Sequence, residues 1–171
     1  MVTQPDSVDV CTADITSRYE EIDPEVEGVV SRVSAINKHV GRAFDETLAH
    51  YGLNHGEYRM LLRLATRSAD NRMSAGELSR ALMLSSGAMT NRMDRLEKTG
   101  LVRRVPDPRD RRGVLVELTE DGRTTIDRAV TEQAAKEIDV MSGLSAKELA
   151  QLNTLLRKVL VSLEHDEAQA V

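Results

Sequence analysis

The sequence predicts a mainly α-helical fold that carries one small β-hairpin. Apolar residues recur at helical spacing along most of the 171 residues, and capping residues stand where these periodic stretches begin. Residues 101–118 instead combine β-branched residues with turn-forming residues, as a hairpin does. Hydrophobic residues make up 40% of the chain, which is enough for a core, and the length suits one domain with added scaffold helices.

An acidic extension over residues 1–22 precedes the first long helix, which is assigned to residues 23–52. Asp23 is a suitable N-cap, and Pro24 suits the first helical position. The apolar residues of this helix recur with a helical period, at Val26, Val29, Val30, Val33, Ile36, Val40, Phe44 and Leu48. A second helix is predicted over residues 53–66 and a loop over residues 68–71.

Residues 74–100 predict two helices joined by a tight turn. Ser74 and Glu77 match a capping box at the start of the first helix. Ser85 or Ser86 can cap the second helix, and Gly100 suits a left-handed C-cap.

The second of these helices has two contrasting faces. Met89, Met93 and Leu96 share one face, which we expect in the core. Apart from one aspartate, the opposite face is small, hydrogen-bonding or cationic: Gly87, Thr90, Asn91, Asp94, Arg95 and Lys98. This mixture suits the reading of base edges in a DNA major groove, although an ordinary amphipathic helix explains the apolar face equally well.

The predicted hairpin is strongly basic. Its strands are expected over residues 102–105 and 114–118, with a turn over residues 106–110. Residues 101–113 hold five arginines and two aspartates, a local charge of +3. A hairpin with arginine at its tip can enter a DNA minor groove; the alternative is a solvated surface hairpin.

The charge is unevenly distributed along a chain whose net charge is −5. Residues 92–112 contain eight Lys or Arg and four Asp or Glu, whereas residues 1–27 contain eight acids and one base. A local basic footprint matters more for DNA binding than total charge. Aromatic residues are only 2% of the chain, which argues against binding of single strands by base stacking.

A helix, a turn, a second helix and a basic hairpin, in this order, are typical of a winged helix-turn-helix. Residues 85–122, SSGAMTNRMDRLEKTGLVRRVPDPRDRRGVLVELTEDG, resemble the MarR family of bacterial transcription regulators. The family's wing signature, Asp-x-Arg-Asp-x-Arg, is similar to residues 107–112 here. The resemblance covers about residues 25–163, and its specific part is residues 74–122.

The resemblance implies a homodimer that binds a palindromic double-stranded DNA operator. The DNA-binding part of each subunit is expected to be a winged helix-turn-helix lobe over residues 53–118. It implies that Arg112 enters the minor groove and that Asp110 holds it. The DNA-binding residues expected on this basis are Ser85, Ser86, Thr90, Asn91, Arg95, Lys98, Arg109, Asp110, Arg111 and Arg112.

In the family the terminal helices interlock between subunits, so residues 23–52 and 119–165 are interpreted as dimerisation helices. After a helix to about residue 141 and a break at Gly143, Ser145 and Glu148 form a capping box. The last helix carries a broad apolar stripe, which alone would also suit a core: Leu149, Leu152, Leu155, Leu156, Val159, Leu160 and Leu163. Residues 166–171 are expected to form a tail.

The recognition helix is similar to that of a MarR subgroup that responds to urate, in which the residue matching Arg92 belongs to the ligand pocket. This chain lacks tryptophan, and Arg59 stands where the subgroup has an aspartate. The added cation favours a di- or tricarboxylate effector, such as citrate or aconitate, over urate. His39 and Arg42 are further candidates for this pocket. The alternatives are that Arg92 is paired with a carboxylate within the structure and that Arg59 and Arg63 form a solvated basic face.

Other classes of function find little support in the sequence. The four histidines lack zinc-ligand spacing, no phosphate-binding glycine-rich loop is present, and no cofactor or enzymatic activity is expected. The absence of a long apolar run, of a signal peptide and of a cysteine pair predicts a cytoplasmic protein without a membrane partner. Cys11 lies in a polar segment that we expect to be a mobile tail. A sequence-tolerant architectural DNA binder and a winged-helix protein-interaction module are the alternative functions.

Overall fold

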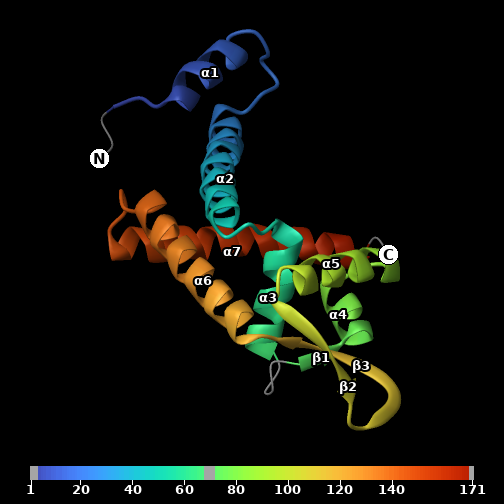
Figure 1. Ribbon diagram of the computed structural model, residues 1–171. Coiled ribbons are helices and arrows are strands. Elements are labelled where there is room, and N and C mark those ends of the chain that lie inside the picture. Colours follow the sequence, from blue (N-terminus) through green and yellow to red (C-terminus); the bar gives the residue numbers. More distant parts are fainter. Residues whose placement is uncertain (1–3, 68–71, 170–171) are drawn as a thin grey trace. The chain divides into compact units, whose positions relative to one another are not determined.

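The computed structural model describes residues 4–67 and 72–169, but not the side chains of residues 67, 111, 112 and 166–169. The helices are α1 (Ser7–Thr16), α2 (Pro24–His50), α3 (His55–Arg67), α4 (Ala75–Leu82), α5 (Ser86–Lys98), α6 (Glu120–Val140) and α7 (Ala146–Gln169). The strands are β1 (Arg72–Ser74), β2 (Val102–Asp107) and β3 (Asp110–Leu118) (Figure 1). The chain divides into two compact units, residues 1–133 and 134–171. The loop predicted over residues 68–71 lies outside the described residues.

The first unit has one hydrophobic core, to which every element from α2 to α6 except β1 contributes buried apolar side chains. Met60, Leu61 and Leu64 of α3 lie at its centre, fully buried. Burying each such side chain stabilises the fold by about 1.5–3 kcal/mol. The predicted inner face of α5 is confirmed, because Met89, Met93 and Leu96 are buried in this core. A mainly helical fold with a small β-structured wing is thus confirmed.

The β-structure is larger than the predicted hairpin. β1 adds an antiparallel third strand, so that the order is β1-β3-β2. Three residues are too few for a visible alternation of polar and apolar positions, so β1 was not predictable from the sequence pattern. The hairpin strands also extend further than expected, and only Pro108 and Arg109 lie between them. A register irregularity at Pro106 and Asp107 accommodates the proline in the ladder.

An ion-pair row crosses the three strands. Glu117 of β3 is the register partner of both Arg72 of β1 and Arg103 of β2. Its side chain is 8% exposed, accepts a hydrogen bond of 2.6 Å from Arg72 Nε, and pairs with Arg103 on the other side. The hydrogen bond from Arg103 and then that from Arg72 hold the pKa of Glu117 below its ordinary value.

We expect Glu117→Gln to lower stability by about 2 kcal/mol at neutral pH, since hydrogen bonds to a charged group are lost. A depressed carboxyl pKa contributes stability above the ordinary carboxyl pKa, and this contribution is lost as the pH falls through the lower value of the folded state. The variant should therefore approach the wild type in stability at acid pH. Urea denaturation at neutral and acid pH measures this, with the exposed Glu164→Gln as a control; equal effects of the two substitutions would contradict it.

The N-terminal extension differs from the expectation of a mobile tail, because residues 7–16 form the helix α1. Asp6 caps this helix and forms a capping box with Asp9. Arg32 of α2 donates a hydrogen bond of 2.8 Å to Asp6 and also pairs with Asp9. Asp6 and Asp9, two of the acids in this segment, thus form ion pairs that attach it to α2. Cys11 is exposed on α1.

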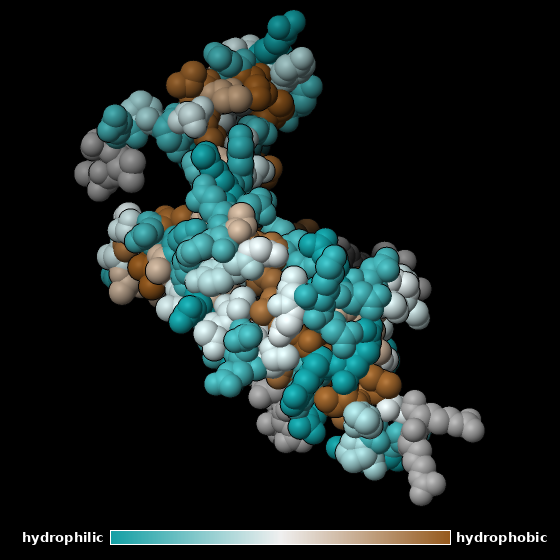
Figure 2. Space-filling model, viewed as in Figure 1, coloured by the Kyte–Doolittle hydropathy of each residue, from teal (hydrophilic) through white to brown (hydrophobic). Residues whose placement is uncertain are grey.

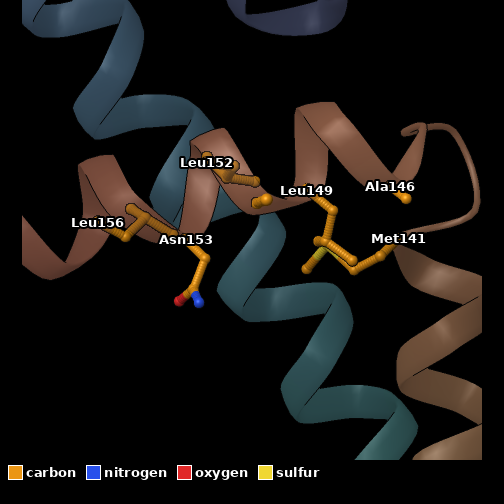
Figure 3. A pocket seen from close by; sticks show the side chains of 7 residues that line it. Met141, Ala146, Leu149, Leu152, Asn153 and Leu156 are labelled. Atoms are coloured by element: carbon orange, nitrogen blue, oxygen red, sulfur yellow. The ribbon is translucent and has the colours of Figure 1, made fainter.

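The second unit contains the end of α6 and the helix α7, which the capping box of Ser145 and Glu148 begins as predicted. An open apolar groove of about 570 Å³ lies at their junction, and Met141, Leu149, Leu152 and Leu156 are among the residues that line it (Figure 3). No helix in the described part of the chain is both long enough and apolar enough to cross a membrane.

Candidate functional site

The outer face of α5 is exposed and polar. Ser85 is its N-cap, and the Oγ of Ser85 accepts a hydrogen bond of 3.4 Å from the backbone N–H of Ala88. The residues of the face predicted to read DNA are all exposed: Ser85, Ser86, Gly87, Thr90, Asn91, Asp94, Arg95 and Lys98. Hydrophilic residues predominate over α5 in Figure 2. The hydroxyl of Thr90 donates to the Ser86 carbonyl at 3.0 Å. Its oxygen is therefore placed to accept a hydrogen bond from a base.

An ion pair attaches α5 to α3. Arg95 Nε lies 2.8 Å from Glu57 Oε1, and Glu57 is only 4% exposed. Glu57 also exchanges hydrogen bonds with Asn54 at the start of α3, at 2.9 and 3.0 Å. The side chain of Arg95 is nevertheless 67% exposed. A buried carboxylate thus restrains Arg95 while leaving much of its guanidinium at the surface.

A second set of ion pairs attaches α5 to β2. Arg104 donates from Nη2 to Asp94 Oδ1 at 2.6 Å and from its backbone N–H to Glu97 Oε1 at 3.2 Å, and its Nη1 also pairs with Glu97. These interactions raise the pKa of the Arg104 guanidinium above its ordinary value, the hydrogen bond to Asp94 most of all. Sequence reasoning missed this contact, because the partners are separated by a turn and by a change of secondary structure.

The wing turn is built by local interactions. The backbone N–H of Arg109 donates to Asp107 Oδ1 at 2.8 Å, which closes an Asx turn. A Cβ at position 113 would lie 2.9 Å from the Cβ of Asp107, so the close return of β3 requires Gly113. The side chain of Arg109 is exposed, and Asp110 begins β3. Arg111 and Arg112 lie on β3 beside this turn, but their side chains are outside the described part of the chain.

The positive charges of the wing therefore fall into two groups. Near the base of the hairpin, Arg103 and Arg104 are paired with Glu117, Asp94 and Glu97. At the tip, Arg109 has no carboxylate within ion-pair distance among the described residues. The sequence predicted arginine at the tip of a basic hairpin, and the structure adds that the arginines near its base are paired while Arg109 at the tip is exposed.

The predicted ligand residue Arg92 is half-buried, and its guanidinium lies against Gly56 at the start of α3. A Cβ at position 56 would overlap the Nη2, Cζ and Nε atoms of Arg92. Among the described residues, Arg92 has no hydrogen-bond or ion-pair partner, so the alternative of a structurally paired arginine finds no support there.

Gly56 shares one face of α3 with two more arginines. Arg59 and Arg63 follow it by three and seven residues, which is the spacing of one helix face. Arg59 is exposed, whereas the Nε of the half-buried Arg63 is buried and has no partner within the described structure. Arg63 was predicted only as part of a solvated basic face. The buried Nε of Arg63 does not fit a fully solvated face.

The other two candidate ligand residues lie on α2. His39 is exposed, and Arg42 is 81% exposed and donates to Glu46 on its own helix at 3.2 Å. Within the described residues, no hydrogen bond or ion pair joins either of them to Arg92 or Arg59. Their role in a ligand pocket stays a prediction.

Two further apolar surfaces lie outside the core. On α2, the side chains of Val26, Val29, Val30, Val33 and Ile36 are 44–61% exposed. On α7, those of Leu155, Leu156, Val159, Leu160 and Leu163 are 46–62% exposed. Monomeric proteins seldom leave stripes of this length uncovered, so these faces point to a partner.

A polar exposed helix, a preceding helix joined to it by a tight turn, and a three-stranded sheet with a basic tip define a winged helix-turn-helix DNA-binding protein. The sequence model of the MarR family matches residues 51–113. The transcriptional regulator PecS of Dickeya dadantii is 37% identical over 147 residues, which cover 83% of this chain and 87% of PecS. The multiple antibiotic resistance protein MarR of Escherichia coli is 31% identical over 134 residues, or 75% of this chain and 88% of MarR.

Solved structures agree with these sequence matches. The apo form of E. coli MarR superposes with a TM-score of 0.62 at 30% identity, covering 82% of this chain and 99% of MarR. A mutant of E. coli MarR in complex with operator DNA gives a TM-score of 0.59 at 30% identity, covering 80% of this chain and 96% of that chain. The chain belongs to the MarR family of transcriptional regulators. Its relatives are regulators and not enzymes, in agreement with the sequence prediction.

Proposed function

We propose that this regulator binds a palindromic DNA operator as a homodimer and acts as a repressor that a small anionic metabolite releases from DNA. The observation that carries the DNA-binding part is the position of exposed charge. The outer face of α5 is polar and exposed, and the arginine at the wing tip is exposed while those at the base are paired with carboxylates. In this proposal, α5 enters the major groove and the wing tip enters the minor groove.

Within this proposal, Thr90, Asn91 and Arg95 read bases, while Ser85, Ser86 and Lys98 contact the DNA backbone. Ser85 and Ser86 lie at the N-terminus of α5, where helix N–H groups favour a phosphate. Arg109, Arg111 and Arg112 supply positive charge at the wing, and Asp110 holds Arg112. The complex of a MarR mutant with operator DNA supports this interpretation by similarity of fold and sequence.

The homodimer is supported by the uncovered apolar stripes of α2 and α7. Two recognition helices related by a two-fold axis can read half-sites about 34 Å apart in successive major grooves. A change in the distance between these helices would then release the DNA without any contact between effector and DNA.

The effector part of the proposal rests on Arg92, Arg59 and Arg63. Arg92 is half-buried without a partner among the described residues, and the Nε of Arg63 is buried and also has no partner among them. Three guanidinium groups on and beside one face of α3 would repel each other, and an anion between them would remove that cost. A di- or tricarboxylate supplies more negative charge than urate, and guanidinium pairs bidentately with carboxylates.

Selection of duplexes from a random-sequence library tests the DNA-binding part, followed by measurement of affinity for the selected sequence at several salt concentrations. We expect Arg112→Ala to weaken binding by about 1–3 kcal/mol and to reduce the slope of log affinity against log salt by about one unit. Arg95→Ala should instead relax preference at one position of each half-site, since an arginine–guanine pair contributes about 1–3 kcal/mol of discrimination.

The outcomes separate the alternative functions. Selection of one palindrome supports the regulator as proposed. Tight binding without any selected sequence would identify an architectural DNA binder, and no binding to duplex DNA would favour a protein-interaction module. An unchanged affinity and salt slope in Arg112→Ala would move the minor-groove contact to Arg109 or Arg111.

A further inference from the structure

The recognition helix α5 carries two acids on or beside the surface proposed to face DNA. Asp94 is 57% and Glu97 38% exposed, and a DNA phosphate near either would be repelled. Both acids are paired with the same residue, Arg104 of β2, whose own side chain is 34% exposed. Of the arginines that form ion pairs in the described part of the chain, Arg104 is the least exposed.

Arg104 is held by its two acidic partners through several donors. Its two Nη groups bind different carboxylates, and its backbone N–H donates to Glu97 as well. With two carboxylates around one guanidinium, the cluster carries a formal charge of −1 in place of −2. A cluster of this net charge would not attract a DNA phosphate.

The same cluster joins the two parts of the DNA-binding lobe. Asp94 and Glu97 lie on α5, and Arg104 lies on the first wing strand, next to Arg103, which is held by Glu117 in the middle of the sheet. On the other side of α5, Arg95 is fixed to Glu57 of α3. The orientation of α5 is therefore set from both sides by ion pairs.

We infer that Arg104 is a positioning residue that determines sequence specificity without contacting DNA. It orients α5 relative to the wing and reduces the repulsion between the DNA phosphates and the acids Asp94 and Glu97. This inference rests on the proposed reading of DNA by α5. It predicts that substitution of Arg104 lowers affinity for a specific duplex more than affinity for a non-specific one, because the orientation of α5 matters only where bases are read.

The test compares affinity for a duplex selected by the wild-type protein with affinity for a scrambled duplex of the same length. We expect Arg104→Lys to reduce the preference for the selected duplex about tenfold, the scale of a good base contact, with little change in affinity for the scrambled one. Lysine keeps the charge but has no planar fork to bridge two carboxylates. Arg103→Lys, on the same strand but paired with Glu117, is the matched control and should keep the preference.

Asp94→Asn gives a second measurement at an exposed position. Loss of a negative charge should strengthen binding to the scrambled duplex, while loss of the Arg104 contact should lower the preference for the selected one. Loss of preference at a single base pair would instead identify Asp94 as a direct base contact and overturn the inference. The inference would also be overturned if Arg104→Ala lowered affinity for both duplexes equally while Arg104→Lys kept the wild-type affinity. Those results would identify a phosphate contact by Arg104.

Failure of the inference can be distinguished from failure of the proposed function. If the wild-type protein selects no preferred sequence, reading of DNA by α5 is wrong, and the inference falls with it. If the wild-type protein selects a sequence and Arg104→Lys retains the preference, only the positioning role is wrong.

Discussion

Glutamate at both Leu156 and Leu160 should convert the protein from a dimer to a monomer and weaken operator binding by about 100-fold or more, because two linked half-sites gain this much from effective concentration. The two leucines are one helical turn apart on α7 and are 46% and 55% exposed. In a dimer interface they would be buried, and two carboxylates there would be desolvated without partners.

Sedimentation measures the oligomeric state, and titration of a selected duplex measures the loss of affinity. The control is Lys158→Glu, which also adds negative charge to an exposed position of α7. α7 belongs to the second compact unit, so the DNA-binding lobe should keep its fold and its weak affinity for a single half-site. A double variant that stays dimeric, or a monomer with wild-type affinity, would contradict the proposed dimer.

Local patterns were sufficient to predict the recognition helix and the wing. Residues 74–100 contain both helix caps and a strict apolar period, and each of these signals acts within a few residues along the chain. The structure accordingly places a capping box at Ser74 and Glu77, an N-cap at Ser85, and Met89, Met93 and Leu96 in the core. The turn between the two helices uses a left-handed residue, Met83, with φ of 52°, where the sequence gives no glycine signal.

Ion-pair partners were not predictable, because they depend on which elements meet in space. The sequence shows five arginines in the hairpin but not their partners: Glu117 pairs with arginines from two neighbouring strands, and Arg104 pairs with Asp94 of α5. Arg95 looked like a base-reading residue alone, and Glu57 of α3 proved to be its partner. The segment around Cys11 was expected to be a mobile tail for the same reason, whereas Asp6 and Asp9 form the capping box of α1 and bind Arg32.

Citrate at millimolar concentration should raise the melting temperature of the wild-type protein by several degrees and lower its affinity for the selected duplex. A ligand that binds only the folded state stabilises it by about 3 kcal/mol at 100 times its Kd. For a chain of this length, each kcal/mol corresponds to about 2–4 °C. Aconitate should act in the same way, and urate should act less because it carries less charge and the chain lacks the tryptophan of the urate-responsive subgroup.

Arg92→Ala should abolish both effects of citrate while leaving DNA binding nearly unchanged. Gly56→Ala is a matched second variant, because its Cβ would displace the Arg92 guanidinium without removing its charge. It should weaken the citrate response even though Arg92 is present. Arg157→Ala, an exposed arginine on α7, is the control that removes one charge elsewhere.

Citrate also stabilises proteins in general, as sulfate does, because such anions are excluded from protein surfaces. Sulfate at equal ionic strength must therefore be measured beside it, and only the shift that citrate adds, and that Arg92→Ala removes, counts as binding. Equal shifts with sulfate and citrate, or equal shifts in wild type and Arg92→Ala, would show that no carboxylate binds at Arg92. Loss of DNA binding in Arg92→Ala without any effector would assign Arg92 a structural role at the junction of α3 and α5, since its guanidinium lies against Gly56 at the start of α3.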